Sequence, residues 1–100
     1  MAISDVQTKG SYYYIIDSSG KKSATLPVSN GELMGAGVDF IVLQKGSYYY
    51  TFDEKAKRLG TLPVSNGDFK NVIGNSFNLK KGSYIYTFDK KCKKTGTRPA

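Results

Sequence analysis

Lys45-Gly46-Ser47-Tyr48-Tyr49-Tyr50-Thr51-Phe52-Asp53 is the stretch that decides the fold, because close copies of it stand before and after it in the chain. Residues 9–17 read KGSYYYIID and residues 81–89 read KGSYIYTFD, so the period is 36 residues. The repeat extends beyond this stretch, since TLPVSNG occurs at both 25–31 and 61–67. A fixed period of this length indicates one supersecondary unit that is used repeatedly.

Each repeat is predicted to contain three strands. The first is apolar, as in residues 38–44, and ends at a Lys-Gly-Ser turn where Gly46 can adopt positive φ. The second is the tyrosine strand, rich in the aromatic and β-branched residues that suit a pleated surface. The third covers 23–28 and then 59–64, and its proline favours a sheet edge or a strand end. The Ser-Asn-Gly that follows is predicted to be a turn or loop.

An aspartate closes each tyrosine strand and is expected to cap the next turn with its side chain. Gly20 at the fourth position of the first such turn suits a left-handed conformation, but Ala56 and Cys92 stand at the equivalent positions. A left-handed conformation would cost these two residues about 1 kcal/mol each. The three aspartates are Asp17, Asp53 and Asp89. Their repetition is explained by turn capping in preference to metal binding.

The two ends of the chain suggest a closed arrangement. Residues 1–8 stand before a Lys-Gly-Ser, where 37–44 stand in the next repeat, and they look like the first strand of a repeat. We therefore expect one all-β domain, 1–100, of three pseudo-threefold repeats, each a three-stranded antiparallel meander. Its repeats would be 9–44, 45–80 and 81–100, the last completed by 1–8. Closure by the N-terminal strand would remove exposed sheet edges.

Alternation along the tyrosine strands predicts which side faces the core. One side carries nearly all the aromatic residues and is expected to be buried, whereas Tyr13 and Tyr49 on the other side are expected to be half-exposed. The predicted core positions are Tyr12, Tyr14, Ile16, Tyr48, Tyr50, Phe52, Tyr84, Tyr86 and Phe88.

The hairpin from Tyr50 to Leu62, YTFDEKAKRLGTL, resembles the outer hairpin of NHL-type β-propeller blades. The repeat is also similar to short bacterial repeat proteins with Gly-Ser-aromatic strands, for which no function is assigned. The first resemblance implies an alternative architecture, half of a dimeric six-bladed propeller in which two chains contribute three units each. A propeller blade has four strands, one more than the repeat is expected to have.

Composition excludes several functions. The chain has no histidine, so Ser-His and Cys-His catalysis and His-ligated metals are excluded, and no cofactor motif is present. Cys92 lies among lysines that would favour its thiolate if it were exposed, but it has no catalytic base and is interpreted as an accidental surface thiol. We therefore expect no enzyme. A single cysteine, no signal peptide and no apolar run of membrane-spanning length favour the cytoplasm and no membrane contact.

Charge and loops leave three functional hypotheses. The leading one is a non-catalytic protein-interaction or self-assembling module, whose partner is another protein or a second copy. The second is nucleic-acid binding, because the excess of positive charge, a net +7, falls entirely within residues 70–100. The third is carbohydrate binding by Ser-Asn-Gly loops beside tyrosines. The candidate binding residues are Tyr13, Tyr49, Asn30, Asn66, Lys90, Lys91, Lys93 and Lys94.

Overall fold

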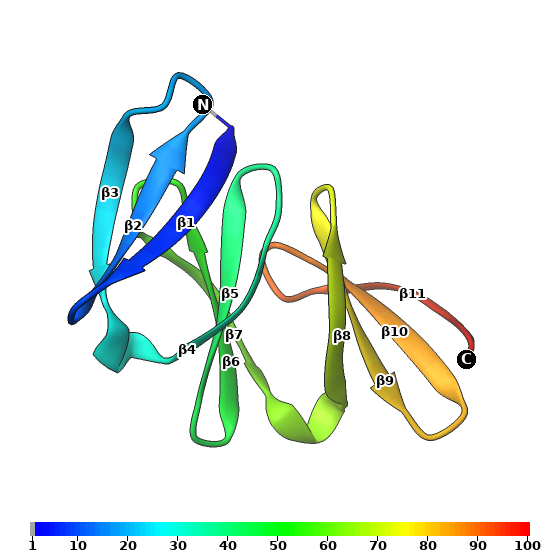
Figure 1. Ribbon diagram of the computed structural model, residues 1–100. Helices are drawn as coiled ribbons and strands as arrows, with labels where there is room; N and C mark the ends of the chain where they lie inside the picture. Colours follow the sequence, from blue (N-terminus) through cyan, green and yellow to red (C-terminus); the bar gives the residue numbers. More distant parts are fainter. Residues whose placement is uncertain (1) are drawn as a thin grey trace.

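The computed structural model describes residues 2–100 as eleven strands and two short 3-10 turns in three antiparallel sheets. The sheets follow one another along the chain and lie side by side (Figure 1). The first sheet contains β1 (Ile3–Lys9), β2 (Tyr12–Asp17) and β3 (Lys22–Pro27). The second contains β4 (Glu32–Ala36), β5 (Phe40–Lys45), β6 (Tyr48–Asp53) and β7 (Arg58–Pro63). The third contains β8 (Asp68–Ile73), β9 (Ser76–Lys81), β10 (Tyr84–Asp89) and β11 (Lys94–Pro99).

The turns within the sheets form as the sequence predicts. The glycine of each Lys-Gly-Ser turn has a φ near 60°, in the left-handed region that only glycine adopts without strain: Gly10, Gly46 and Gly82. In the next turn Asp17 Oδ1 accepts hydrogen bonds from two backbone amides, and its equivalents in the other repeats do the same. The capping interpretation of the aspartates is therefore confirmed. Ala56 and Cys92 adopt φ of 63° and 66°, so both carry the expected left-handed strain.

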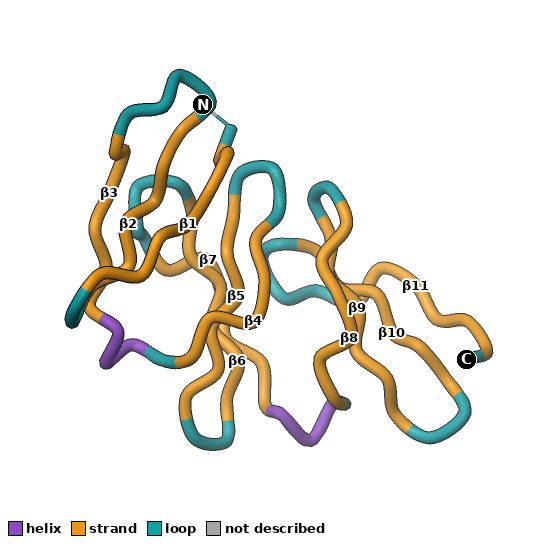
Figure 2. Tube along the Cα trace, in the orientation of Figure 1, coloured by secondary structure: helices purple, strands orange, loops and turns teal. Residues whose placement is uncertain are grey.

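The prediction of three strands per repeat is wrong, because β4 and β8 add a fourth strand to the second and third sheets. Each follows a Ser-Asn-Gly segment. The serine and asparagine of these segments belong to the two 3-10 turns, η1 (Val28–Asn30) and η2 (Val64–Asn66). These turns carry the chain from one sheet to the next (Figure 2). The Ser-Asn-Gly segment is thus a turn, as predicted, but the chain beyond it continues as a strand.

The predicted closure of the domain is also wrong. Strand β1 pairs with β2 at the edge of the first sheet, and β11 pairs with β10 at the edge of the third. The three sheets form an open row in which the first and last strands lie far apart (Figure 1). Four strands are the number that a propeller blade requires, so the half-propeller alternative remains a hypothesis about assembly.

Two apolar clusters fill the spaces between neighbouring sheets. The first and second sheets share a cluster made of Tyr13, Ile15, Leu26, Ile41, Leu43 and Phe52. The second and third share a cluster made of Phe40, Val42, Tyr49, Leu62, Phe77, Leu79 and Phe88. The second sheet is therefore buried on both faces, which explains why β5 has four fully buried residues in succession.

This stacking corrects the predicted faces of the tyrosine strands. Phe52 and Phe88 are buried as predicted, but Ile16 and the middle tyrosines Tyr14, Tyr50 and Tyr86 are only partly buried. The first tyrosine of each strand is exposed, at 44% to 49%, because it lies beside the Lys-Gly-Ser turn at the end of the sheet: Tyr12, Tyr48 and Tyr84.

Tyr13 and Tyr49, expected to be half-exposed, are buried at 7% and 3% exposure. The Tyr13 hydroxyl donates a hydrogen bond to the Gly31 carbonyl at 2.7 Å, and Tyr49 donates to Gly67 at 2.9 Å. Burial raises the pKa of the Tyr49 hydroxyl, which keeps it a neutral donor. Both tyrosines therefore fasten the Ser-Asn-Gly turn to the sheet, and neither is available to a ligand.

No helix among residues 2–100 is long and apolar enough to cross a membrane.

Candidate ligand-binding pockets

Two small cavities lie on equivalent surfaces of the second and third sheets. The larger, about 190 Å³, is lined by Asn66, Lys81, Tyr86, Phe88 and Lys94. The other, about 150 Å³, is lined by Asn30, Lys45, Tyr50, Phe52 and Arg58. Each residue of the second set stands 36 positions before its counterpart in the first set. The repeat therefore builds the same pocket twice, with Arg58 replaced by Lys94 as the one difference in residue type.

Strand register places four of the five residues on one face. In the third sheet Phe88 pairs with both Phe77 and Lys94, and Tyr84 pairs with Lys81. Because side chains opposite one another on neighbouring strands share a face, Lys81, Tyr86, Phe88 and Lys94 project from the same side. That is the side packed against the second sheet, as the presence of Phe88 in the shared cluster shows.

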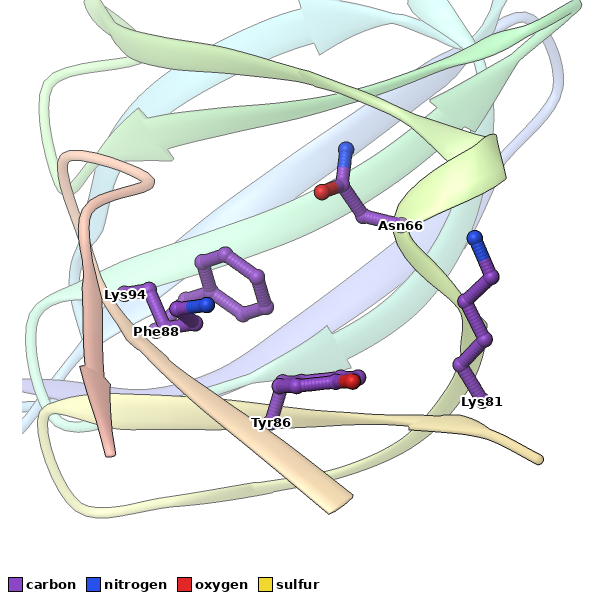
Figure 3. Close-up of a pocket in the computed structure, with 5 residues that line it drawn as sticks. All are labelled: Asn66, Lys81, Tyr86, Phe88 and Lys94. Carbon is purple, nitrogen blue, oxygen red and sulfur yellow. The ribbon is translucent and has the colours of Figure 1, made fainter. Parts of the chain in front are cut away.

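The fifth residue comes from the turn that links the two sheets. Asn66 ends η2, and its Nδ2 donates to the Pro63 carbonyl at 3.0 Å, which fixes the amide over the sheet. The Lys81 ammonium donates to the Ser65 carbonyl at 2.9 Å on the same turn. In Figure 3, Asn66 and Lys81 lie on one side of the cavity and Phe88 and Lys94 on the other, with Tyr86 between them. Asn30 is held in the same way by Pro27 at 3.1 Å.

A cation stacks on the tyrosine of each pocket. Lys94 Nζ lies 5.1 Å from the ring centroid of Tyr86, and the Arg58 guanidinium lies 5.8 Å from that of Tyr50. Cation–π contacts of this length are worth about 0.5–1 kcal/mol at exposed sites. They hold the cation of the last strand, Arg58 on β7 or Lys94 on β11, over the pocket and cover one face of the tyrosine ring.

The sequence anticipated three of the pocket residues, Asn30, Asn66 and Lys94. Lys91 and Lys93 are exposed on the hairpin tip between β10 and β11 and line neither cavity. Lys90 instead forms an ion pair with Asp39 at 2.6 Å, and this hydrogen bond raises the pKa of its ammonium group. The sequence reasoning missed the residues Lys45, Tyr50, Phe52, Arg58, Lys81, Tyr86 and Phe88 as site residues, although their spacing of 36 was visible.

Cys92 is not an activated thiol. It is partly buried beneath the second sheet, where its Sγ lies 3.7 Å from Thr51 Oγ1. Burial raises its pKa, although lysines surround it in the sequence. Among residues 2–100 there is also no group of three or more side chains that could hold a metal ion.

Comparison with known proteins does not assign the chain to a family. No family model matches the sequence, and no significant match was found among curated proteins or solved structures.

Proposed function

We propose that the protein is a non-catalytic binding module that uses two equivalent pockets to bind the same chemical group twice. The observation that supports this proposal is the spacing of 36 residues between every pair of corresponding lining residues. A core requires the phenylalanines, but it does not require two cations and an amide at the mouth of the same cavity. Cavities of this size hold a small group rather than a whole drug-sized ligand.

Carbohydrate is the ligand class that these pockets favour among the three hypotheses drawn from the sequence. Each pocket joins a Ser-Asn-Gly asparagine to a tyrosine hydroxyl, which are groups that hydrogen-bond sugar hydroxyls. The tyrosines involved are Tyr50 and Tyr86, not the buried Tyr13 and Tyr49. Nucleic-acid binding has weaker support, since Lys90 is paired with Asp39 and only Lys94 of the predicted lysines lines a pocket.

A glycan array that also carries single-stranded nucleic acids and peptides tests the proposal. The wild type is compared with Asn30→Ala/Asn66→Ala, which alters both pockets, and with the control Asn75→Ala, an exposed residue of the turn between β8 and β9. We expect at least one ligand whose signal falls in the double variant and persists in the control. If every bound ligand is retained by the double variant at unchanged melting temperature, the pockets are not the binding site.

A further inference from the structure

The pockets are positively charged as well as polar. Each contains one lysine from the end of the second strand of the sheet and one cation from the last strand, together with a tyrosine hydroxyl. Of the described residues, those that line the two cavities include no aspartate or glutamate to neutralise these cations. Two cations at one cavity repel each other until an anion enters, so the empty pocket favours a negatively charged group.

Building on the proposed binding function, we propose that each pocket binds an oxyanion, a carboxylate or a sulfate, carried by a sugar that also presents a hydroxyl. In the third sheet Lys81 Nζ and Lys94 Nζ supply charge-assisted donors from opposite sides of the cavity, and the Tyr86 hydroxyl supplies a third donor (Figure 3). The Asn66 amide uses its Nδ2 on Pro63 and has its Oδ1 as the acceptor for a hydroxyl. Polygalacturonate, for example, carries a carboxylate and free hydroxyls on each sugar residue.

The same geometry disfavours nucleic acid as the ligand. Proteins bind single strands by stacking bases on open aromatic rings. Here Lys94 covers one face of the Tyr86 ring and Arg58 covers one face of the Tyr50 ring, so these faces are not open to a stacking base. Single-stranded DNA also offers no free hydroxyl beside its phosphate for the asparagine oxygen.

Two equivalent pockets in one chain suit a polymer with a repeated acidic group. When one pocket is occupied, a second acidic residue of the same polymer is presented to the other pocket at high effective concentration. A long acidic polysaccharide should therefore bind more tightly than its monosaccharide, and the gain should disappear when either pocket is removed.

The test measures binding of four probes to the full chain at physiological salt: polygalacturonate for carboxylate, heparin for sulfate, dextran as a neutral sugar and oligo-deoxythymidine. The pocket variant is Lys45→Gln/Lys81→Gln. Its control, Lys91→Gln/Lys93→Gln, removes the same charge from exposed lysines that line neither cavity. A second pocket variant, Tyr50→Phe/Tyr86→Phe, removes only hydroxyl groups and keeps the rings that pack on the core.

We expect polygalacturonate or heparin to bind, and the arm that binds identifies the oxyanion. The lysine pocket variant should weaken this binding by about tenfold or more, because each lost charge-assisted hydrogen bond is worth about 1.5–3 kcal/mol. The control should weaken it by about twofold at most, as expected for distant exposed charges screened by salt. The tyrosine variant should also weaken it while melting at an unchanged temperature.

Other outcomes overturn the inference in distinguishable ways. Equal losses in the pocket variant and the control would show general charge attraction. Pocket-dependent binding of dextran alone would refute oxyanion binding by the pockets and would still support the proposed function. Pocket-dependent binding of oligo-deoxythymidine above both acidic polysaccharides would assign the pockets to nucleic acid. If none of the four probes binds, oxyanion binding by the pockets is refuted. The glycan array with the asparagine double variant then tests the proposed function separately.

Discussion

Adding one methyl group at Gly60 tests the stacking of the sheets, because the equivalent change at Gly96 provides a matched control. Gly60 lies on β7 of the second sheet, and an added Cβ would stand 2.7 Å from the Lys91 carbonyl oxygen and 3.1 Å from Cys92 Sγ of the third sheet. Gly96 occupies the same place on β11, where nothing lies within 4 Å. The two glycines are equivalent in register, since Gly60 pairs with Thr51 of β6 and Gly96 pairs with Thr87, the corresponding residue of β10.

The backbone atoms that the new methyl group meets cannot rotate away, so the turn at Lys91 has to move. That movement disturbs the hydrogen bond from Thr51 Oγ1 to the Lys90 carbonyl, which is 2.6 Å long. We expect Gly60→Ala to lower the free energy of unfolding by about 1–3 kcal/mol, the usual cost of overpacking. Gly96→Ala should raise it by up to about 1 kcal/mol, because alanine loses less entropy in a strand than glycine does.

Urea unfolding followed by tyrosine fluorescence or far-UV circular dichroism measures both variants on one scale, and the chain has no tryptophan to complicate the signal. The melting temperature should change by roughly 4–8 °C for each kcal/mol in a chain of this size. Equal stabilities for the two variants would show that the third sheet does not pack against Gly60, and the stacking described above would be refuted.

Three further predictions concern single residues. Phe52→Ala should lower the free energy of unfolding by about 3–5 kcal/mol, because Phe52 is buried between the first two sheets. Its control, Tyr12→Ala at an exposed position, should lower it by less than about 1 kcal/mol. Similar losses for the two variants in urea unfolding would contradict the assigned burial. Cys92 should react with iodoacetamide more slowly at pH 8 than a cysteine in an unstructured peptide, because burial raises its pKa and lowers the thiolate fraction; equal rates in native buffer would refute this. The Ser19 hydroxyl donates a hydrogen bond to the Asp17 carboxylate and lowers its pKa, so the stability that this carboxylate contributes is present above about pH 4 and is lost as the pH falls through its lower folded pKa. Ser19→Ala should therefore make the loss of stability below about pH 4 less steep. An unchanged dependence of stability on acid pH would contradict this coupling.

The sequence predicted the local structure of the repeat well, because its turn residues have few alternatives. Gly46 at positive φ and the capping aspartates follow from backbone chemistry that acts over a few residues. Strand β4 escaped prediction because its sequence, ELMGA, lacks alternation and contains a glycine. Gly35 is required by the neighbouring sheet, since a Cβ there would lie 2.8 Å from Val72 Cγ2. A contact between sheets thus determines that residue, and local propensity does not.

The faces of the tyrosine strands could not be predicted from alternation for a different reason. Three successive tyrosines are aromatic on both sides, so a period of two carries little information at Tyr48, Tyr49 and Tyr50. Burial is decided by where the neighbouring sheet lies, which leaves Tyr49 in the core and Tyr48 in solvent. The pockets were missed because Lys45 ends β5 and Arg58 begins β7, on either side of the tyrosine strand β6. Only the register that pairs Lys45 with Tyr48 and Phe52 with Arg58 places them on one face of the sheet.

The outer face of the third sheet is polar at positions where the second sheet is apolar. Where the second sheet presents Phe40 and Val42 to the third, the third sheet itself carries Ser76 and Asn78 on its outer face. Asn78 donates to Asn71 at 2.7 Å and accepts from Thr87 at 2.6 Å, so this polar face is satisfied without a partner. Asn78 is already buried at 4% exposure, so these groups do not distinguish an open row from a ring, and the half-propeller alternative stays a hypothesis.

The first sheet separates the structural role of the repeated cations from their proposed role in binding. Lys22 Nζ stacks on Tyr14 at 4.4 Å, as Arg58 and Lys94 stack on their own tyrosines, yet no Ser-Asn-Gly turn precedes this sheet within residues 2–100. The cation–tyrosine pair therefore belongs to every repeat and supports the strand pair whether or not a pocket is complete. The cavities of the second and third sheets each include the asparagine of the preceding Ser-Asn-Gly turn. Each of these two cavities is therefore lined by residues of two consecutive repeats and lies at a junction between neighbouring sheets.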